Sequence, residues 1–212
     1  FNWTYDGTAP TMAITASEVS DGDTSNDGTL SLTFTSSEST SNFVVGDITV
    51  NGGALSSFAG SGTTYTATFT PSGAGATTID VASSTFTDAA GNNNIAATQF
   101  NWTYDSVVPT MTITAAEVSD GDTSNDATLS LTFTASEATT DFAVADISVI
   151  NGELSNFATT SSTVYTATFT PTASGATTID VSVNTFKDSS GNKNAAATQF
   201  NWTYDSVVPT MT

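Results

Sequence analysis

The chain contains no cysteine and no histidine, and its only basic residues are Lys187 and Lys193. General-base and thiol catalysis therefore lose their usual side chains, and no serine or carboxylate pair has a recognisable activating partner. We expect no enzymatic activity. Binding to nucleic acid is excluded as well, because contacts to phosphate require basic residues. The 21 acidic residues give a net charge of −19, a self-repulsion that salt or bound cations would offset.

Long apolar runs are also missing, and no stretch approaches the length of a membrane span. The chain begins at Phe1, without an initiator methionine or the basic and apolar segments of a secretion signal. We interpret it as part of a longer exported protein whose signal and anchor lie elsewhere, and we expect an extracellular or cell-surface location. The strongly acidic composition favours surroundings that are rich in cations.

The sequence does contain a tandem repeat. Residues 100–112, FNWTYDSVVPTMT, recur unchanged as residues 200–212, and a diverged copy, FNWTYDGTAPTMA, opens the chain. Pro10 recurs as Pro109, 99 positions later, and Tyr65 as Tyr165, 100 positions later, which is the period of a small domain. The repeat predicts the last strand of a preceding unit in 1–6, complete units in 7–105 and 106–205, and the start of a following unit in 206–212.

Apolar residues alternate with threonine and serine along most of each unit, which is typical of half-buried β-strands, and no stretch has helical periodicity. Turn residues interrupt this alternation, for example Asn151-Gly152 and the run from Asp188 to Asn192. Seven short strands in about a hundred residues predict an all-β fold of tandem antiparallel sandwiches of the immunoglobulin type. In the second unit the predicted strands lie around residues 111–113, 129–133, 147–149, 154–157, 165–169, 179–183 and 200–204.

An ordered set of motifs carries a family resemblance. The motifs are SEATTDFAVADISVINGELSNF, YTATFTP, TTIDVSVNTFKDSSGNKNAA and FNWTYDSVVPTMTIT. Together they resemble the tandem bacterial Ig-like (Big-type) repeats of large extracellular adhesins and surface proteins, and the resemblance covers essentially the whole chain. It implies an Ig-like sandwich that serves as a spacer or extender, often in calcium-rich surroundings, and it implies no enzymatic activity.

Acidic and amide side chains gather where we expect neighbouring units to join. If successive strands alternate in direction, the loops that carry Glu137, Asp188 and Asn192 lie at the same pole of the second unit. Asp105 lies in the linker that leads into this pole. Calcium binds to several hard oxygen ligands of this kind, so the junction is a candidate calcium site. The repeat places an equivalent set at the preceding junction: Asp6, Glu38 and Asp88.

A second candidate calcium site lies in the loop after the first strand of each unit. Its ligands would be three aspartates, namely Asp21, Asp23 and Asp27 in the first unit and Asp120, Asp122 and Asp126 in the second. Their spacing resembles the opening of an EF-hand loop that lacks the later glycine and glutamate of that motif. For both candidate sites the alternative is a turn without metal, in which aspartate and asparagine side chains bond to backbone amides.

The leading interpretation is a structural spacer of a secreted or surface-anchored adhesin or fibre, stiffened by calcium at the junctions between units. A second interpretation is a subunit of an extracellular filament or sheath, assembled through contacts between like chains. A third is a carbohydrate-binding module, because Phe100, Trp102 and Tyr104 share one face of a strand and sugars stack on such rings. The alternative for these aromatic residues is the core of the sandwich.

Overall fold

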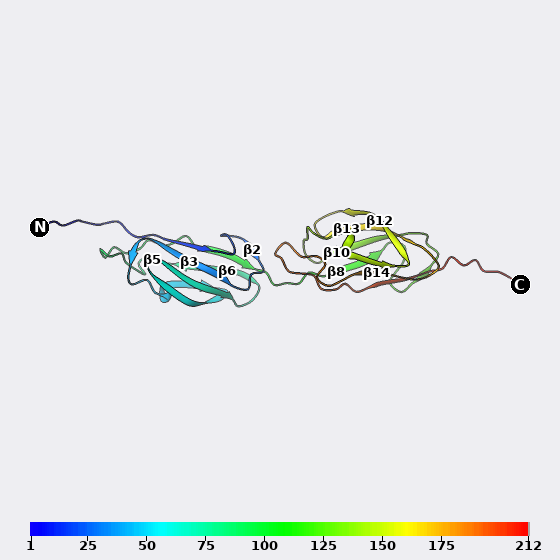
Figure 1. Cartoon of the computed structure of the whole chain (residues 1–212), viewed down its shortest axis with the longest axis horizontal. Helices are drawn as coiled ribbons and strands as arrows, with labels where there is room; N and C mark the ends of the chain where they lie inside the picture. Colours follow the sequence, from blue (N-terminus) through cyan, green and yellow to red (C-terminus); the bar gives the residue numbers. More distant parts are fainter. Residues whose placement is uncertain (212) are drawn as a thin grey trace. The chain divides into compact units, whose positions relative to one another are not determined.

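The computed structural model describes residues 1–211 and divides after Ser106 into two compact units, Phe1–Ser106 and Val107–Thr212 (Figure 1). Each unit contains two β-sheets, which confirms the predicted all-β sandwich. Thr212 is the last residue of the segment predicted to begin a following unit, and it lies outside the described residues.

In the first unit one sheet has the strand order β1-β3-β5 and the other has the order β2-β7-β6-β4. The two halves of β5 lie against each other, since a Cβ atom added at Gly53 would collide with the carbonyl oxygen of Thr70. The elements are β1 (Met12–Ala16), β2 (Thr24–Ser25), β3 (Leu30–Thr40), the 3-10 turn η1 (Val45–Asp47), β4 (Ile48–Asn51), β5 (Gly53–Pro71), β6 (Gly75–Val81) and β7 (Phe100–Tyr104).

In the second unit the sheets have the orders β12-β13-β10-β8 and β11-β14-β15-β9. All seven strands predicted for this unit are present, although Val183 lies beyond the end of its strand and is 55% exposed. The elements are β8 (Met111–Ala115), β9 (Thr123–Ser124), β10 (Leu129–Ala135), η2 (Val144–Asp146), β11 (Ile147–Ile150), β12 (Gly152–Thr159), β13 (Val164–Pro171), β14 (Gly175–Val181) and β15 (Phe200–Tyr204).

Two short strands, β2 and β9, lie within the loops predicted to follow the first strand of each unit. Each pairs in parallel with the last strand of its own unit, for example Thr24 with Thr103. The alternating pattern does not reveal them because each contains only two residues and its partner is distant in sequence. Their effect is to hold the acidic loop against the edge of the second sheet.

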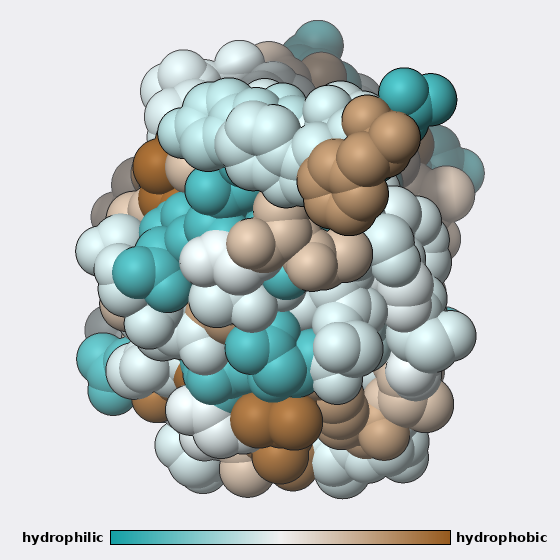
Figure 2. All heavy atoms as spheres, turned by 90° about the vertical axis from the view of Figure 1, so that its left-hand side faces the viewer, coloured by the Kyte–Doolittle hydropathy of each residue, from teal (hydrophilic) through white to brown (hydrophobic). Residues whose placement is uncertain are grey.

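The alternation of side chains along the strands builds a separate core in each unit. Thr33 on β3 pairs with Thr66 on β5, and both side chains point away from the core. Figure 2 shows the face at the left-hand side of Figure 1, where residues of intermediate hydropathy predominate and strongly hydrophilic and hydrophobic residues are scattered among them. The fully buried side chains include Leu30, Leu32, Phe34, Phe69 and Phe86 in the first unit.

The aromatic residues of the last strand belong to this core. Trp102 and Trp202 are each 1% exposed, and Phe100 and Phe200 are buried as well. Tyr104 is partly buried and packs against the same core. The proposed sugar-binding face on this strand is therefore wrong, because its rings fill the interior of the sandwich.

The copy of this aromatic motif at the start of the chain forms no strand. Phe100–Tyr104 pairs with β6, whereas residues 1–6 pair with no strand within the described residues, and Trp3 is 74% exposed. A β-strand needs a hydrogen-bonding partner, which explains why the same residues adopt different structures in the two places. The assignment of residues 1–6 to a preceding unit stays a prediction.

Candidate metal centre

Three carboxylates that are far apart in the sequence meet in the first unit. Asp6 lies before β1, Glu38 lies near the end of β3, and Asp88 lies in the loop that follows β6. One oxygen from each side chain lies within 4.8 Å of the other two. Asp6 is exposed, Glu38 is half-buried and Asp88 is buried. The fold therefore brings together the set of residues predicted for the preceding junction.

A tight turn fixes the position of Asp88. Its backbone N–H donates to the carbonyl oxygen of Asn92 over 3.1 Å, and the N–H of Asn92 donates to Asp88 Oδ1 over 2.8 Å. The side-chain amide of Asn92 donates to Asp88 Oδ2 over 2.8 Å and to the backbone carbonyl oxygen of Asp6 over 3.3 Å. Asn92 thus connects two of the three acidic residues.

Asn92 was not among the ligands predicted from the sequence, although the equivalent Asn192 was. The signal was available, because both residues follow a glycine near the end of the same repeated turn. The amide of Asn92 has a clear electrostatic effect, since its hydrogen bond is the main cause that lowers the pKa of Asp88 below the ordinary value. Burial of Asp88 acts in the opposite direction and is outweighed.

Glu38 experiences the opposite effect. Burial, and then the negative charges of Asp6 and Asp88, raise the pKa of the Glu38 carboxyl above its ordinary value. The first unit contains no lysine or arginine that could balance these charges. A compact set of carboxylate oxygens without a basic neighbour fits a hard divalent cation, and calcium prefers such ligands.

The second unit repeats the turn. The N–H and the side-chain amide of Asn192 donate to the two carboxylate oxygens of Asp188 over 2.9 and 3.0 Å, and both residues are buried. Glu137 follows β10 in this unit and is half-buried. Asp105 belongs to the first unit, where its N–H donates to the carbonyl oxygen of Ser25 over 2.9 Å. The calcium site predicted for Asp105, Glu137 and Asp188 stays a prediction.

The aspartates of the loop after the first strand do not gather in the same way. Within residues 1–211 they form no group of three close carboxylates, either as Asp21, Asp23 and Asp27 or as Asp120, Asp122 and Asp126. Each carboxylate instead accepts a hydrogen bond of its own, and the first unit shows the pattern. Asp21 Oδ1 accepts from the N–H of Asn101 over 2.6 Å, and Asp23 Oδ2 accepts from the N–H of Ser20 over 2.7 Å.

The third aspartate of this loop supports a buried tryptophan. The indole Nε1–H of Trp102 donates to the Ser25 hydroxyl oxygen over 3.0 Å, and that hydroxyl donates to Asp27 Oδ2 over 2.7 Å. The second unit has the same chain from Trp202 through Ser124 to Asp126. These side chains hold the loop against the last strand, and the calcium site predicted for the loop stays a prediction.

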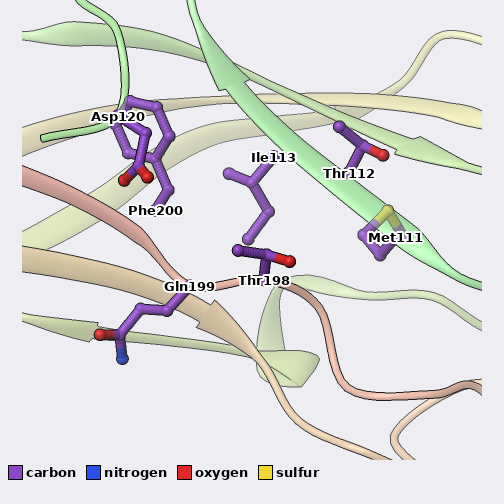
Figure 3. A pocket seen from close by; sticks show the side chains of 7 residues that line it. All are labelled: Met111, Thr112, Ile113, Asp120, Thr198, Gln199 and Phe200. Atoms are coloured by element: carbon purple, nitrogen blue, oxygen red, sulfur yellow. The ribbon is translucent and has the colours of Figure 1, made fainter.

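A shallow hollow of about 250 Å³ lies beside the first strand of the second unit, and Figure 3 shows its lining. Asp120 is the only acidic or basic residue among those that line it, so no acid–base pair faces the hollow. The first unit has an equivalent hollow of about 280 Å³ with Asp21 in the same position. The lining residues in Figure 3 are Met111, Thr112, Ile113, Asp120, Thr198, Gln199 and Phe200.

Comparison with known proteins gives one family match. The family described as bacterial Ig-like domain matches residues 6–104 and again residues 105–204. No curated protein matches the chain. Among the described residues, no helix is both long enough and apolar enough to cross a membrane.

Several solved structures are similar to the chain at low sequence identity. FdeC, an adhesin of Escherichia coli, is 16% identical with a TM-score of 0.48, and the match covers 90% of this chain and 63% of FdeC. InvD of Yersinia pseudotuberculosis is 19% identical with a TM-score of 0.41, covering 94% and 60%. Invasin, a bacterial integrin-binding protein, is 17% identical with a TM-score of 0.46, covering 92% and 40%. The chain thus spans less than two thirds of each of these structures.

Proposed function

Because the chain belongs to the bacterial Ig-like domain family, we propose that it is a structural spacer in a secreted or surface-anchored bacterial adhesin or fibre. The observation that carries this proposal is the tandem repetition of one sandwich. Each copy has its own hydrophobic core and its own pair of sheets. Repetition of a complete domain adds length to a protein and requires no catalytic site.

The charge distribution supports an extracellular spacer. Residues 7–105 contain nine acidic and no basic residues, and residues 106–205 contain eleven acidic and two basic residues, so each unit carries a net charge of −9. Units of like charge repel one another, which favours an extended chain and opposes lateral association. Such repulsion favours a spacer over a subunit of a filament, and a spacer requires no catalytic group.

We further propose that the cluster of Asp6, Glu38 and Asp88 binds calcium. Its support is the close approach of the three carboxylates and the raised pKa of Glu38, which a divalent cation would reverse. Asp6 precedes the first strand, whereas Glu38 and Asp88 belong to the body of the sandwich. A calcium ion shared by these residues would restrain the segment that enters the unit. On the sequence prediction for Asp105, Glu137 and Asp188, the same restraint would apply at the next junction.

Two measurements on the full chain test this function. Analytical ultracentrifugation over a wide concentration range should show a monomer, whereas association that grows with concentration would favour the filament subunit. Small-angle X-ray scattering in calcium and in chelator then tests the restraint. We expect a larger and better-defined maximum dimension in calcium, and equal profiles in the two conditions would contradict the role of calcium in stiffening.

A further inference from the structure

A larger hollow, of about 550 Å³, lies in the first unit where the end of β3 approaches the middle of β5. None of the acidic residues of the candidate metal centre lines it. Its lining combines aromatic rings with hydroxyl groups, which is a different chemistry from that of the carboxylate cluster. The residues that matter are Phe43, Phe58, Tyr65, Ser39, Ser41 and Ser61.

The three aromatic rings form one packed group. The rings of Phe58 and Tyr65 are stacked, with centroids 5.8 Å apart and an interplanar angle of 14°, and Phe43 meets both rings edge-on. The Tyr65 hydroxyl donates to the carbonyl oxygen of Thr40 over 2.9 Å, which fixes its ring. Phe43 and Tyr65 are buried, whereas Phe58 is half-buried. Phe58 therefore supplies the apolar surface that a ligand in the hollow can contact.

The serine hydroxyls complement this surface. Ser39, Ser41 and Ser61 are exposed, and within residues 1–211 their hydroxyls form no hydrogen bond to another protein group. The second unit differs here, because the hydroxyl oxygen of Ser161 accepts from the N–H groups of Thr163 and Val164 over 3.2 and 3.1 Å. The first unit thus keeps its hydroxyls available to a ligand where the second unit uses one within its own turn.

Two glycines shape the rim of the hollow. Gly60 has a φ of 137° and Gly62 has a φ of 67°, conformations that other residues rarely adopt. A Cβ atom at Gly62 would have the Ser39 hydroxyl oxygen as its nearest neighbour, 3.7 Å away, so the absence of a side chain leaves space beside Ser39. The second unit has Thr160 and Ser162 in the corresponding turn. The glycines are therefore a specific feature of the first unit.

The charge of the unit decides which ligand fits. The first unit has no basic residue, so an anionic ligand would meet only repulsion. A neutral molecule with one apolar face and several hydroxyl groups would match both the Phe58 ring and the serines. We propose that this hollow binds a neutral saccharide, with the apolar face of one sugar ring on Phe58 and its hydroxyl groups bonded to Ser39, Ser41 and Ser61.

The test uses nuclear magnetic resonance of the isotope-labelled full chain, titrated to millimolar concentration with maltotriose, cellotriose and triacetylchitotriose. We expect at least one sugar to shift the amide signals of residues 39–43 and 58–62. Residues 138–142 and 157–162 are the matched control in the second unit, and their signals should not move. No shift with any of the three sugars, or equal shifts in both units, would overturn the proposal.

Variants then test the named side chains. Phe58→Leu keeps an apolar side chain but removes the ring, and it should weaken binding about tenfold. Phe157→Leu in the second unit is the matched control and should leave the affinity unchanged. The triple change of Ser39, Ser41 and Ser61 to alanine alters only exposed positions and should abolish binding. Unchanged affinity in the Phe58 variant and in the triple variant would contradict the proposed site.

Discussion

Asn92 holds both carboxylate oxygens of Asp88, one through its backbone N–H and one through its side-chain amide, each over 2.8 Å. The turn between them therefore presents a buried carboxylate in a fixed orientation beside Asp6 and Glu38. This relationship recurs between Asn192 and Asp188 in the second unit. It connects a local feature of the sequence, a short turn, with the site on which the proposed role of calcium depends.

Replacement of Asn92 tests whether the amide stabilises the ionised Asp88. Asn92→Ala removes the main cause of the lowered pKa of Asp88, so this pKa should rise. A carboxyl whose pKa is lowered by folding stabilises the fold above its unfolded pKa, and the contribution is lost as the pH falls through the folded pKa. Urea unfolding should therefore show a lower midpoint for the variant at neutral pH, with a smaller difference in acid.

Asn93, the exposed neighbour of Asn92, provides the control for the unfolding experiment. Asn93→Ala changes the same residue type one position away and should leave the unfolding midpoint close to that of the wild type. Equal midpoints for the wild type and Asn92→Ala at neutral pH would show that the amide does not stabilise the turn.

The pKa of Glu38 should affect stability in the opposite direction from that of Asp88. Its pKa is raised by burial and by Asp6 and Asp88, so it binds a proton more tightly in the folded state. The stability that this proton confers is present at low pH and is lost as the pH rises through the folded pKa. In chelator at neutral pH, Glu38→Gln should therefore raise the melting temperature, as calorimetry can measure.

Glu18 provides a contrast within the same unit. Its Oε2 accepts from the N–H of Ser31 over 2.8 Å, and its pKa is lowered although burial acts to raise it. Glu18→Gln should lower the melting temperature under the conditions in which Glu38→Gln raises it. A lower melting temperature for both variants would contradict the prediction that repulsion within the cluster destabilises the fold.

The hydrogen bond between Trp102 and Ser25 should be important for stability. Ser25→Ala would leave the buried indole N–H without its acceptor, which costs about 1–3 kcal/mol. Urea unfolding monitored by tryptophan fluorescence measures this loss. Ser56→Ala alters an exposed serine of the same unit and should have little effect, and a similar small effect for Ser25→Ala would contradict the assigned role.

Close backbone packing at Gly53 gives a further prediction. An added Cβ atom would collide with the ring of Phe69 and the carbonyl oxygen of Thr70, so Gly53→Ala should destabilise the first unit by about 1–3 kcal/mol. Gly28 has no atom within 4 Å of an added Cβ, and Gly28→Ala should be tolerated. Thermal unfolding of the two variants provides the comparison, and equal melting temperatures would show that the site can relax.

The alternation of apolar and polar residues was sufficient to predict the main strands, because each side chain on a strand faces either the core or the solvent. It could not reveal β2 and β9, whose pairing depends on the last strand of each unit. The same limit explains why the hydrogen bonds of the acidic loop were not predicted from the sequence. Asp21 bonds to Asn101, 80 positions away, and no local spacing indicates that partner.

The candidate metal centre was predictable for a different reason. Antiparallel strands place alternate loops at the same pole, so strand order alone brings Asp6, Glu38 and Asp88 together. Asn92 was missed because turn residues of this kind are common, and only the hydrogen bonds show that its amide faces Asp88. The hollow at Phe58 depends on backbone angles at Gly60 and Gly62, which the repeat pattern does not encode.

The most direct test of the account is calorimetric melting of the full chain in chelator and in millimolar calcium, for the wild type and for Glu38→Gln. A ligand that binds only the folded state must raise the melting temperature. We predict a rise for the wild type in calcium and a clearly smaller rise for Glu38→Gln, which lacks one of the three carboxylates. An unchanged melting temperature of the wild type in calcium would contradict the proposed calcium site.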